Sequence, residues 1–240
     1  MTEYKRAWFY LSDKPEKDTV LLKIALCEKG REAYENAHNI LEELQKGSSL
    51  LKNPAFKQNA YIYYISGKFN KSLYLIRDKD EYHLRLLSSW NHIRLKQWQY
   101  ARTTLKNLLE LNKQTGKQLY DLYADLDKNN IPVRKKPFIS ALFSAVIPGL
   151  GKVYCGRYSD GIYSFLVNGI FIYAAVNSHN HGYKTRTAVL TGAASVFYLG
   201  NVYGSYLAAN VVNRENEDNF IQHLENKYHH NLTNLFSIQF

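Results

Sequence analysis

A long stretch with almost no charge restricts what this chain of 240 residues can fold into. Between Lys152 and Arg214, the charged residues are Arg157, Asp160, Lys184 and Arg186. Apolar runs of this length are costly to expose to water, so a soluble helical domain would have to cover them. A membrane-spanning helix instead needs about 20 mainly apolar residues. The stretch favours a helical membrane module, and a soluble hydrophobic domain is the alternative.

Three apolar segments make up this module, at 137–151, 161–176 and 188–212. The third is long enough to cross a bilayer, and Tyr158 and Ser178 extend the second without placing a charge deep inside it. The first segment is short and is interrupted by Pro148. We expect an interfacial or re-entrant helix at 137–151 and transmembrane helices at about 158–178 and 188–212.

Charge divides the chain at the start of this module. Residues 1–136 contain 25 Lys and Arg against 16 Asp and Glu, whereas the rest of the chain is nearly neutral. We predict a helical domain at 1–133, the membrane module at 134–213 and an amphipathic tail at 214–240. The basic charge suggests anionic partners. Anionic lipid is favoured over nucleic acid, because the Lys and Arg residues are scattered among acidic neighbours.

Spacing within the first region indicates a repeat. Ala25, Tyr34 and Ala37 are separated by nine and then three positions. The same intervals recur in two further sets, which are Ala60, Phe69 and Ser72, and Ser89, Trp98 and Ala101. Small residues let antiparallel helices approach closely, and the aromatic residue fills space at their turn. Over roughly residues 1–112 the pattern resembles the tetratricopeptide repeat (TPR), a helix–turn–helix of about 34 residues; a plain helical bundle is the alternative.

The TPR resemblance implies a concave groove that binds a polypeptide. In this register the groove-facing side chains include Tyr61, Tyr64, Trp90 and Arg94. Aromatic rings beside a guanidinium suit a peptide with apolar anchors and an acidic group, although each could instead pack against a neighbouring helix. Residues 2–10 look like the second helix of a repeat, so we expect an upstream helix or a signal peptide before Met1.

A second resemblance lies in the turn after the first apolar segment. Its pattern is P-G-x-G-x-x-Y-x-G-R-x-x-D-G, formed by Pro148, Gly149, Gly151, Tyr154, Gly156, Arg157, Asp160 and Gly161. The third segment contains F-Y-x-G-N-x-Y-G, which includes Gly200, Asn201, Tyr203 and Gly204. Together these motifs resemble a bacterial module of two membrane helices. That family often carries TPR-like repeats in front, has no settled biochemical activity, and in many members begins with a signal peptide.

Physical chemistry suggests structural roles for residues of this module. Gly200, Gly204 and Ala208, at intervals of four, would form a flat stripe for helix packing. Asn168 and Asn201 would hydrogen-bond to each other or to backbone at membrane depth, which we prefer to a role in transport. Arg157 and Asp160 are three positions apart and would form an ion pair, and Arg157 could also hold a lipid phosphate.

Catalytic, metal and cofactor sites are not indicated. The chain has no glycine-rich phosphate loop followed by Lys and Ser or Thr. His179 and His181 form His-x-His, but no acidic or thiol ligand is near in sequence. In the tail, Phe220, Ile221, Leu224 and Tyr228 have helical spacing, so the tail is expected to lie on the membrane or against the repeats.

We therefore predict an all-α, non-enzymatic adaptor or scaffold. A TPR-like array would bind a protein partner, and a transmembrane hairpin would hold it as a multi-pass protein in the bacterial inner membrane. A role in envelope or membrane-protein biogenesis is a hypothesis from this architecture. The alternative is a small transporter or lipid-handling membrane protein with a regulatory repeat domain. The positive charges at 134–136 favour a cytoplasmic repeat domain, and a lost signal peptide would reverse this orientation.

Overall fold

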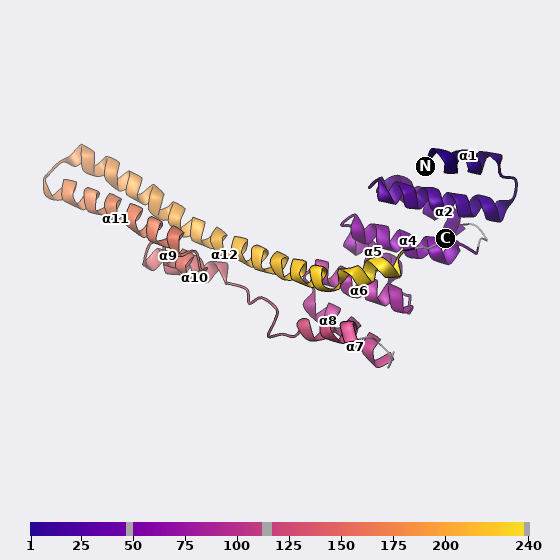
Figure 1. Cartoon of the computed structure of the whole chain (residues 1–240). Helices are drawn as coiled ribbons and strands as arrows, with labels where there is room; N and C mark the ends of the chain where they lie inside the picture. Colours follow the sequence, from indigo (N-terminus) through magenta and orange to yellow (C-terminus); the bar gives the residue numbers. More distant parts are fainter. Residues whose placement is uncertain (47–49, 112–116, 238–240) are drawn as a thin grey trace. The chain divides into compact units, whose positions relative to one another are not determined.

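The computed structural model describes residues 1–46, 50–111 and 117–237. In these residues the regular structure is entirely helical, which confirms the predicted all-α class. The chain forms two compact units (Figure 1): unit 1 comprises residues 1–130 and 221–240, and unit 2 comprises residues 131–220. The last helix, α12 (Lys184–Leu235), contributes to both units. The residues predicted as a separate tail are therefore largely the continuation of α12.

Unit 1 is built largely from consecutive helix pairs. After α1 (Thr2–Tyr10), the pairs are α2 (Lys14–Gly30) with α3 (Tyr34–Lys46), α4 (Lys52–Ile65) with α5 (Phe69–Ile76), and α6 (Tyr82–Arg94) with α7 (Trp98–Leu111). The next helix, α8 (Lys117–Asp125), packs on α7. Each pair also contacts the following pair, so the helices stack side by side (Figure 1).

The three pairs turn in the same way. Glu32, Gly67 and Lys96 each have a positive φ, of 60°, 75° and 60°. In each pair the aromatic residue of the predicted set begins the second helix two positions later. The small residues of the three sets, Ala25, Ala37, Ala60, Ser72, Ser89 and Ala101, are fully buried. Ser72 Oγ donates to the carbonyl oxygen of Ala60 at 3.0 Å, which shows how closely α4 and α5 approach.

Unit 2 begins with two short helices. The first, α9 (Pro137–Val146), ends before Pro148, which holds Ile147 in an extended conformation with a φ of −130°. A single-turn helix, α10 (Leu150–Tyr154), follows and packs on α9. Next come α11 (Tyr158–Asn180) and the antiparallel first part of α12 (Figure 1). Phe171 on α11 and Phe197 on α12 stack with their ring centroids 4.5 Å apart.

Among the described residues, α11 is the one helix that is both long and apolar enough to cross a membrane. It has 23 residues and is about 34 Å long at 1.5 Å per residue, against a bilayer core of about 30 Å. The prediction of a second membrane-spanning helix, at 188–212, is therefore not supported by the criterion of length and hydropathy. The reason lies in the 188–212 stretch of α12, where glycines, tyrosines and Asn201 lower the mean hydropathy.

Candidate functional site

The four residues predicted to face a groove lie on two neighbouring helices of unit 1. Tyr61 and Tyr64 are on α4, and Trp90 and Arg94 are on α6. They do not line an open groove, because the end of α12 covers them and the three aromatic side chains are buried. We call these four residues, together with Gln58 of α4, the α4–α6 surface.

The segment that covers this surface, residues 221–236, is named the C-terminal segment here. Its side facing the other helices of unit 1 is apolar and almost completely buried, and comprises Ile221, Leu224, Tyr228, Leu232 and Phe236. The intervals of three and then four place these residues on one face of the helix. The sequence predicted docking on the repeats as one of two positions for the tail, and the structure has this arrangement.

Specific contacts fix the segment on the α4–α6 surface. Arg94 Nη1 donates to Glu225 Oε1 at 2.9 Å. The ring of Phe236 stacks on Tyr61 with centroids 4.8 Å apart, and its carbonyl oxygen accepts a 2.6 Å hydrogen bond from Gln58 Nε2. The surface thus contacts an aromatic anchor, a carboxylate and a backbone carbonyl.

Electrostatics at this surface follow from burial. Burial raises the pKa of the Tyr64 phenol well above its ordinary value, and the neighbouring Glu225 carboxylate raises it further while Arg94 lowers it. Burial is also the main cause of the raised pKa of Tyr61. Both phenols are therefore neutral hydrogen-bonding groups. The charged side chains in contact with this surface include Lys29, Arg94 and Glu225.

A second contact holds the segment to α8. Lys227 Nζ and Tyr228 Oη both donate to Asp125 Oδ2, at 2.8 Å and 2.7 Å. Burial opposes ionisation of the Asp125 carboxyl, but these hydrogen bonds outweigh it and lower the pKa. The sequence did not predict roles for Asp125, Glu225 and Phe236. The one available signal was that the apolar spacing of 221, 224 and 228 continues to 236.

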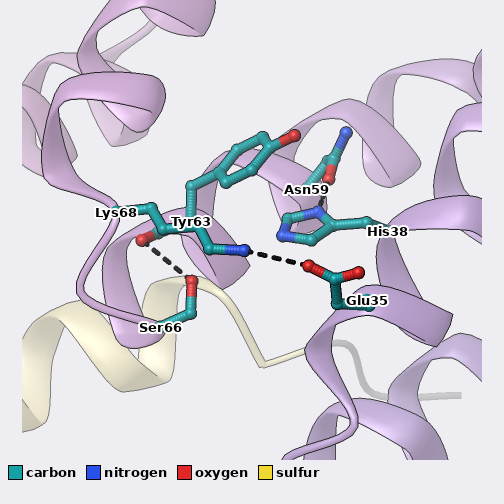
Figure 2. Close-up of polar contacts among 6 residues, drawn as sticks. All are labelled: Glu35, His38, Asn59, Tyr63, Ser66 and Lys68. Atoms are coloured by element: carbon teal, nitrogen blue, oxygen red, sulfur yellow. Dashed lines mark hydrogen bonds and ion pairs between the residues drawn. The ribbon is translucent and has the colours of Figure 1, made fainter.

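Figure 2 shows a polar cluster between α3 and α4 that the sequence analysis also missed. His38 is buried, its Nδ1 is hydrogen-bonded to Asn59 Oδ1, and its ring stacks on Tyr63 at a centroid distance of 4.0 Å. Nearby, Lys68 Nζ pairs with Glu35 Oε1 at 3.3 Å. Burial lowers the pKa of His38, so the neutral imidazole is the favoured form.

In unit 2, three glycines of the turn motif are required by close backbone contacts. A Cβ atom at Gly149, where φ is +90°, would lie 2.1 Å from the carbonyl oxygen of Gly161. A Cβ at Gly161 would lie 2.6 Å from Val153 Cγ2, and one at Gly151 would lie 1.9 Å from the carbonyl oxygen of Ser140. These contacts pack α10 directly against α9 and the start of α11.

Serine hydroxyls join the helices of unit 2. Ser140 Oγ lies 2.7 Å from the carbonyl oxygen of Ser205 and 2.9 Å from that of Gly151. Ser144 Oγ lies 2.6 Å from Ser205 Oγ and accepts a hydrogen bond from the amide of Gly151 at 2.9 Å. Buried hydroxyl and backbone groups thus satisfy one another between α9, α10 and α12.

The two predicted asparagines are buried but do not hydrogen-bond to each other in the structure. Asn168 Nδ2 donates to the carbonyl oxygen of Ser164 at 2.8 Å, and Asn201 Nδ2 donates to that of Ser144 at 3.5 Å. The Oδ1 atoms of both have no hydrogen-bond partner. On the same side of α11, Lys152 Nζ donates to Ser164 Oγ at 2.7 Å.

The remaining motif residues divide into packed and exposed positions. Arg157 Nε pairs with Asp160 Oδ2 at 2.7 Å, as predicted, with both side chains about half exposed. Tyr154 Oη accepts a 3.3 Å hydrogen bond from the amide of Lys136. Gly156 has a φ of +83°, which suits glycine.

The predicted packing stripe on α12 is only partly used. A Cβ at Gly204 would contact the Lys152 side chain at 3.8 Å, and Ala208 is buried. A Cβ at Gly200 would meet nothing within 4 Å, and Tyr203 is largely exposed. Gly200 is exposed on the outer side of α12, so the part of the stripe that packs within this chain is at Gly204 and Ala208.

Polarity in unit 2 is inverted relative to a water-soluble domain. The buried positions of α11 are small or polar, and comprise Gly161, Ser164, Asn168, Ala175 and Ser178. The exposed positions of the same helix include Ile162, Phe165, Leu166, Ile170 and Tyr173. Soluble proteins seldom expose apolar surface this continuously, whereas helices in a bilayer pack through small and polar residues.

The described part of the chain holds no cluster of three or more His, Cys, Asp or Glu side chains placed to bind a metal ion. Comparisons with protein-family models, with characterised protein sequences and with solved structures find no match for this chain. The function must therefore be argued from the two units themselves.

Proposed function

We propose that this protein is a non-enzymatic, membrane-anchored adaptor that binds a polypeptide through unit 1. The observation that carries the proposal is the α4–α6 surface, which is engaged by an amphipathic helix with an aromatic anchor and a paired carboxylate. A surface of this composition is suited to a helical polypeptide ligand. The three helix pairs with a common turn support a TPR-like array as its scaffold.

The membrane part of the proposal is supported by the inverted polarity of unit 2. We propose that α11 and the first part of α12 enter the bilayer as a hairpin, which would make the protein multi-pass, with α9 at the interface. Two polar residues that lower the hydropathy of α12, Asn201 and Ser205, face inward and are buried. The excess of Lys and Arg in residues 1–136 would add attraction to anionic lipid headgroups. We propose that the adaptor lies in a bacterial inner membrane. Its partners would be nascent or exported proteins of the cell envelope.

The adaptor function is tested by photocrosslinking in intact cells. A photoreactive residue at position 94, on the α4–α6 surface, is expected to form adducts with a second protein. Mass spectrometry of the adducts should map the contact to a helix that carries an acidic residue. A photoreactive residue at Tyr100, exposed on α7, is the matched control and should give none of these adducts. Absence of any adduct to another protein from position 94 would overturn the adaptor function.

A second candidate function is favoured by one observation in unit 2. The buried Oδ1 atoms of Asn168 and Asn201 lack partners, and polar atoms at membrane depth often mark a transport or lipid path. Replacing both asparagines with leucine distinguishes the candidates. If the amides serve packing, the double variant loses stability; if they serve transport of a polar substrate or lipid, it stays folded and transport is lost.

A further inference from the structure

The C-terminal segment leaves part of the surface beneath it unfilled. A cavity of about 300 Å³ lies where the segment crosses α6 and α8. Its walls include the apolar side chains Trp90, Leu119 and Leu122 from these helices. From the segment itself, Tyr228, Leu235 and the polar Asn234 line the cavity. A larger apolar side chain in place of Asn234 would remove more apolar surface from water.

The segment is also held by groups that another helix could supply. Its contact with Arg94 needs one carboxylate, and its contact with Tyr61 needs one aromatic ring. The ion pair is partly exposed to solvent, and exposed pairs of this kind contribute little stability on their own. The segment therefore supplies a carboxylate and an aromatic ring to the surface but leaves the cavity beside Trp90 unfilled.

We propose that the C-terminal segment is a resident, displaceable ligand of the α4–α6 surface, and that the partner is an amphipathic helix of the same pattern. This inference rests on the proposed adaptor function. The partner helix presents an acidic residue to Arg94, an aromatic residue to Tyr61 and a large apolar side chain to the cavity beside Trp90. Because the segment and the partner use the same surface, the segment must leave before the partner binds.

The direct test uses the full-length chain in lipid nanodiscs and a fluorescent synthetic peptide of residues 219–237 as the probe. The wild-type chain, with its own segment in place, is expected to bind the peptide at least tenfold more weakly than a Leu224→Glu, Leu232→Glu variant. Both leucines are fully buried in the interface, so the charges displace the segment. Equal binding by the two chains would overturn the inference.

The cavity is tested with altered peptides. An Asn234→Leu peptide is expected to bind the displaced variant about threefold to tenfold more tightly than the natural peptide, because leucine fills apolar space. An Asn226→Leu peptide is the matched control, since Asn226 is exposed and does not line the cavity, and its affinity should be unchanged. An Asn234→Leu peptide that binds no more tightly than the control would contradict the proposed role of the cavity.

Charge reversal provides a test that leaves the apolar packing intact. A Glu225→Arg chain is expected to gain peptide binding, and a Glu225→Arg, Arg94→Glu chain should lose it again because the ion pair is restored in reverse. The wild-type peptide should not bind the double variant, whose surface repels its glutamate. If the Glu225→Arg chain binds the peptide no better than wild type, or if the double variant binds it as well as the single variant, the resident-ligand inference fails. If peptide binding behaves as described but position 94 captures no protein in cells, the adaptor function fails instead.

Discussion

Glu32 and Lys96 hold the same left-handed backbone conformation as Gly67, at the equivalent place in three helix pairs. A side chain in this conformation costs about 1–2 kcal/mol relative to glycine. Two of the three turns therefore carry backbone strain that the third avoids. In both strained turns the second helix of the pair begins two residues later, at Tyr34 or Trp98.

Exchanging these residues should change stability in opposite directions. Lys96→Gly is expected to raise the free energy of unfolding of unit 1 by about 0.5 kcal/mol, after the greater entropy of an unfolded glycine is subtracted. Gly67→Ala should lower it by about 1 kcal/mol through φ alone, because a Cβ there meets nothing within 4 Å. Urea unfolding followed by tryptophan fluorescence measures both, since Trp8, Trp90 and Trp98 all lie in unit 1. A Lys96→Gly change that lowers stability, or a Gly67→Ala change that raises it, would show that the turns are not strained as described.

His38 makes the stability of unit 1 depend on pH. Burial is the main cause of its lowered pKa; Lys68 lowers the pKa further, while the hydrogen bond to Asn59 and the carboxylates of Glu42 and Glu35 raise it. The unfolded chain therefore binds the proton more readily than the folded chain. Stability contributed by neutral His38 is fully present above the unfolded pKa of about 6.5 and is lost as the pH falls below it.

We expect the urea concentration at the unfolding midpoint of the wild-type chain to decrease when the pH is lowered from 7.5 to 5.5. His38→Gln, which keeps an amide able to hydrogen-bond with Asn59 but cannot be protonated, should show a smaller fall over this interval. The comparison is made between slopes against pH, because the substitution also lowers stability at every pH. Parallel slopes for the two chains would exclude His38 as a source of the dependence.

At the scale of elements, close contacts between backbones organise unit 2. The single turn of α10 is seated between α9 and α11 because Gly149, Gly151 and Gly161 have no side chain. The Ser140 hydroxyl shares its one proton between the carbonyl oxygens of Gly151 and Ser205. The helices are held by small-residue packing and hydrogen bonds, as expected where burial of apolar side chains has no water to exclude.

Gly151→Ala is expected to separate α9 from α10. The added methyl would overlap the carbonyl oxygen of Ser140, and overpacking of this kind costs about 1–3 kcal/mol. Buried Cys155, whose Sγ is 3.4 Å from Ser140 Oγ, reports the change through its rate of maleimide labelling in a Cys27→Ser background. The rate should rise about tenfold. Gly169→Ala, with nothing within 4 Å of the new methyl, is the control and should label like the parent.

At the scale of the whole molecule, the two units follow opposite rules of burial. Unit 1 has an apolar core, in which Leu22, Leu41 and Ile62 are buried together. Unit 2 buries Ser140, Asn168 and Ser205 and exposes apolar side chains. Under the proposal that α11 enters a bilayer, unit 1 would lie in water and the exposed apolar side chains of unit 2 would face lipid.

Alkaline extraction of membranes tests whether unit 2 is inserted in the bilayer. The wild-type chain is expected to stay in the membrane pellet. If α11 spans the bilayer as proposed, a Leu166→Lys, Ile170→Lys variant should be released, because each lysine near the centre of a lipid-facing helix costs about 2.5–3.5 kcal/mol. A Tyr74→Lys, Tyr100→Lys variant, altered at equally exposed positions of unit 1, should be retained. Release of the wild-type chain by alkali would contradict membrane insertion.

Local spacing was enough to anticipate much of this protein. Intervals of nine and three marked small residues that are fully buried and placed an aromatic residue near the turn of each helix pair. The turn motif predicted the Arg157–Asp160 pair. These features depend on residues near one another in the sequence, where helical periodicity and glycine conformation act directly.

Contacts between distant residues required the assembled helices. The apolar face of the C-terminal segment was visible in the sequence, but its seat on Gln58, Tyr61 and Arg94 was not. The sequence likewise did not determine the outward position of Gly200 or the hydrogen bond between His38 and Asn59. A periodic sequence specifies which face of a helix is apolar. Which other face it covers depends on the shape and charge of surfaces that exist only after the helices have packed.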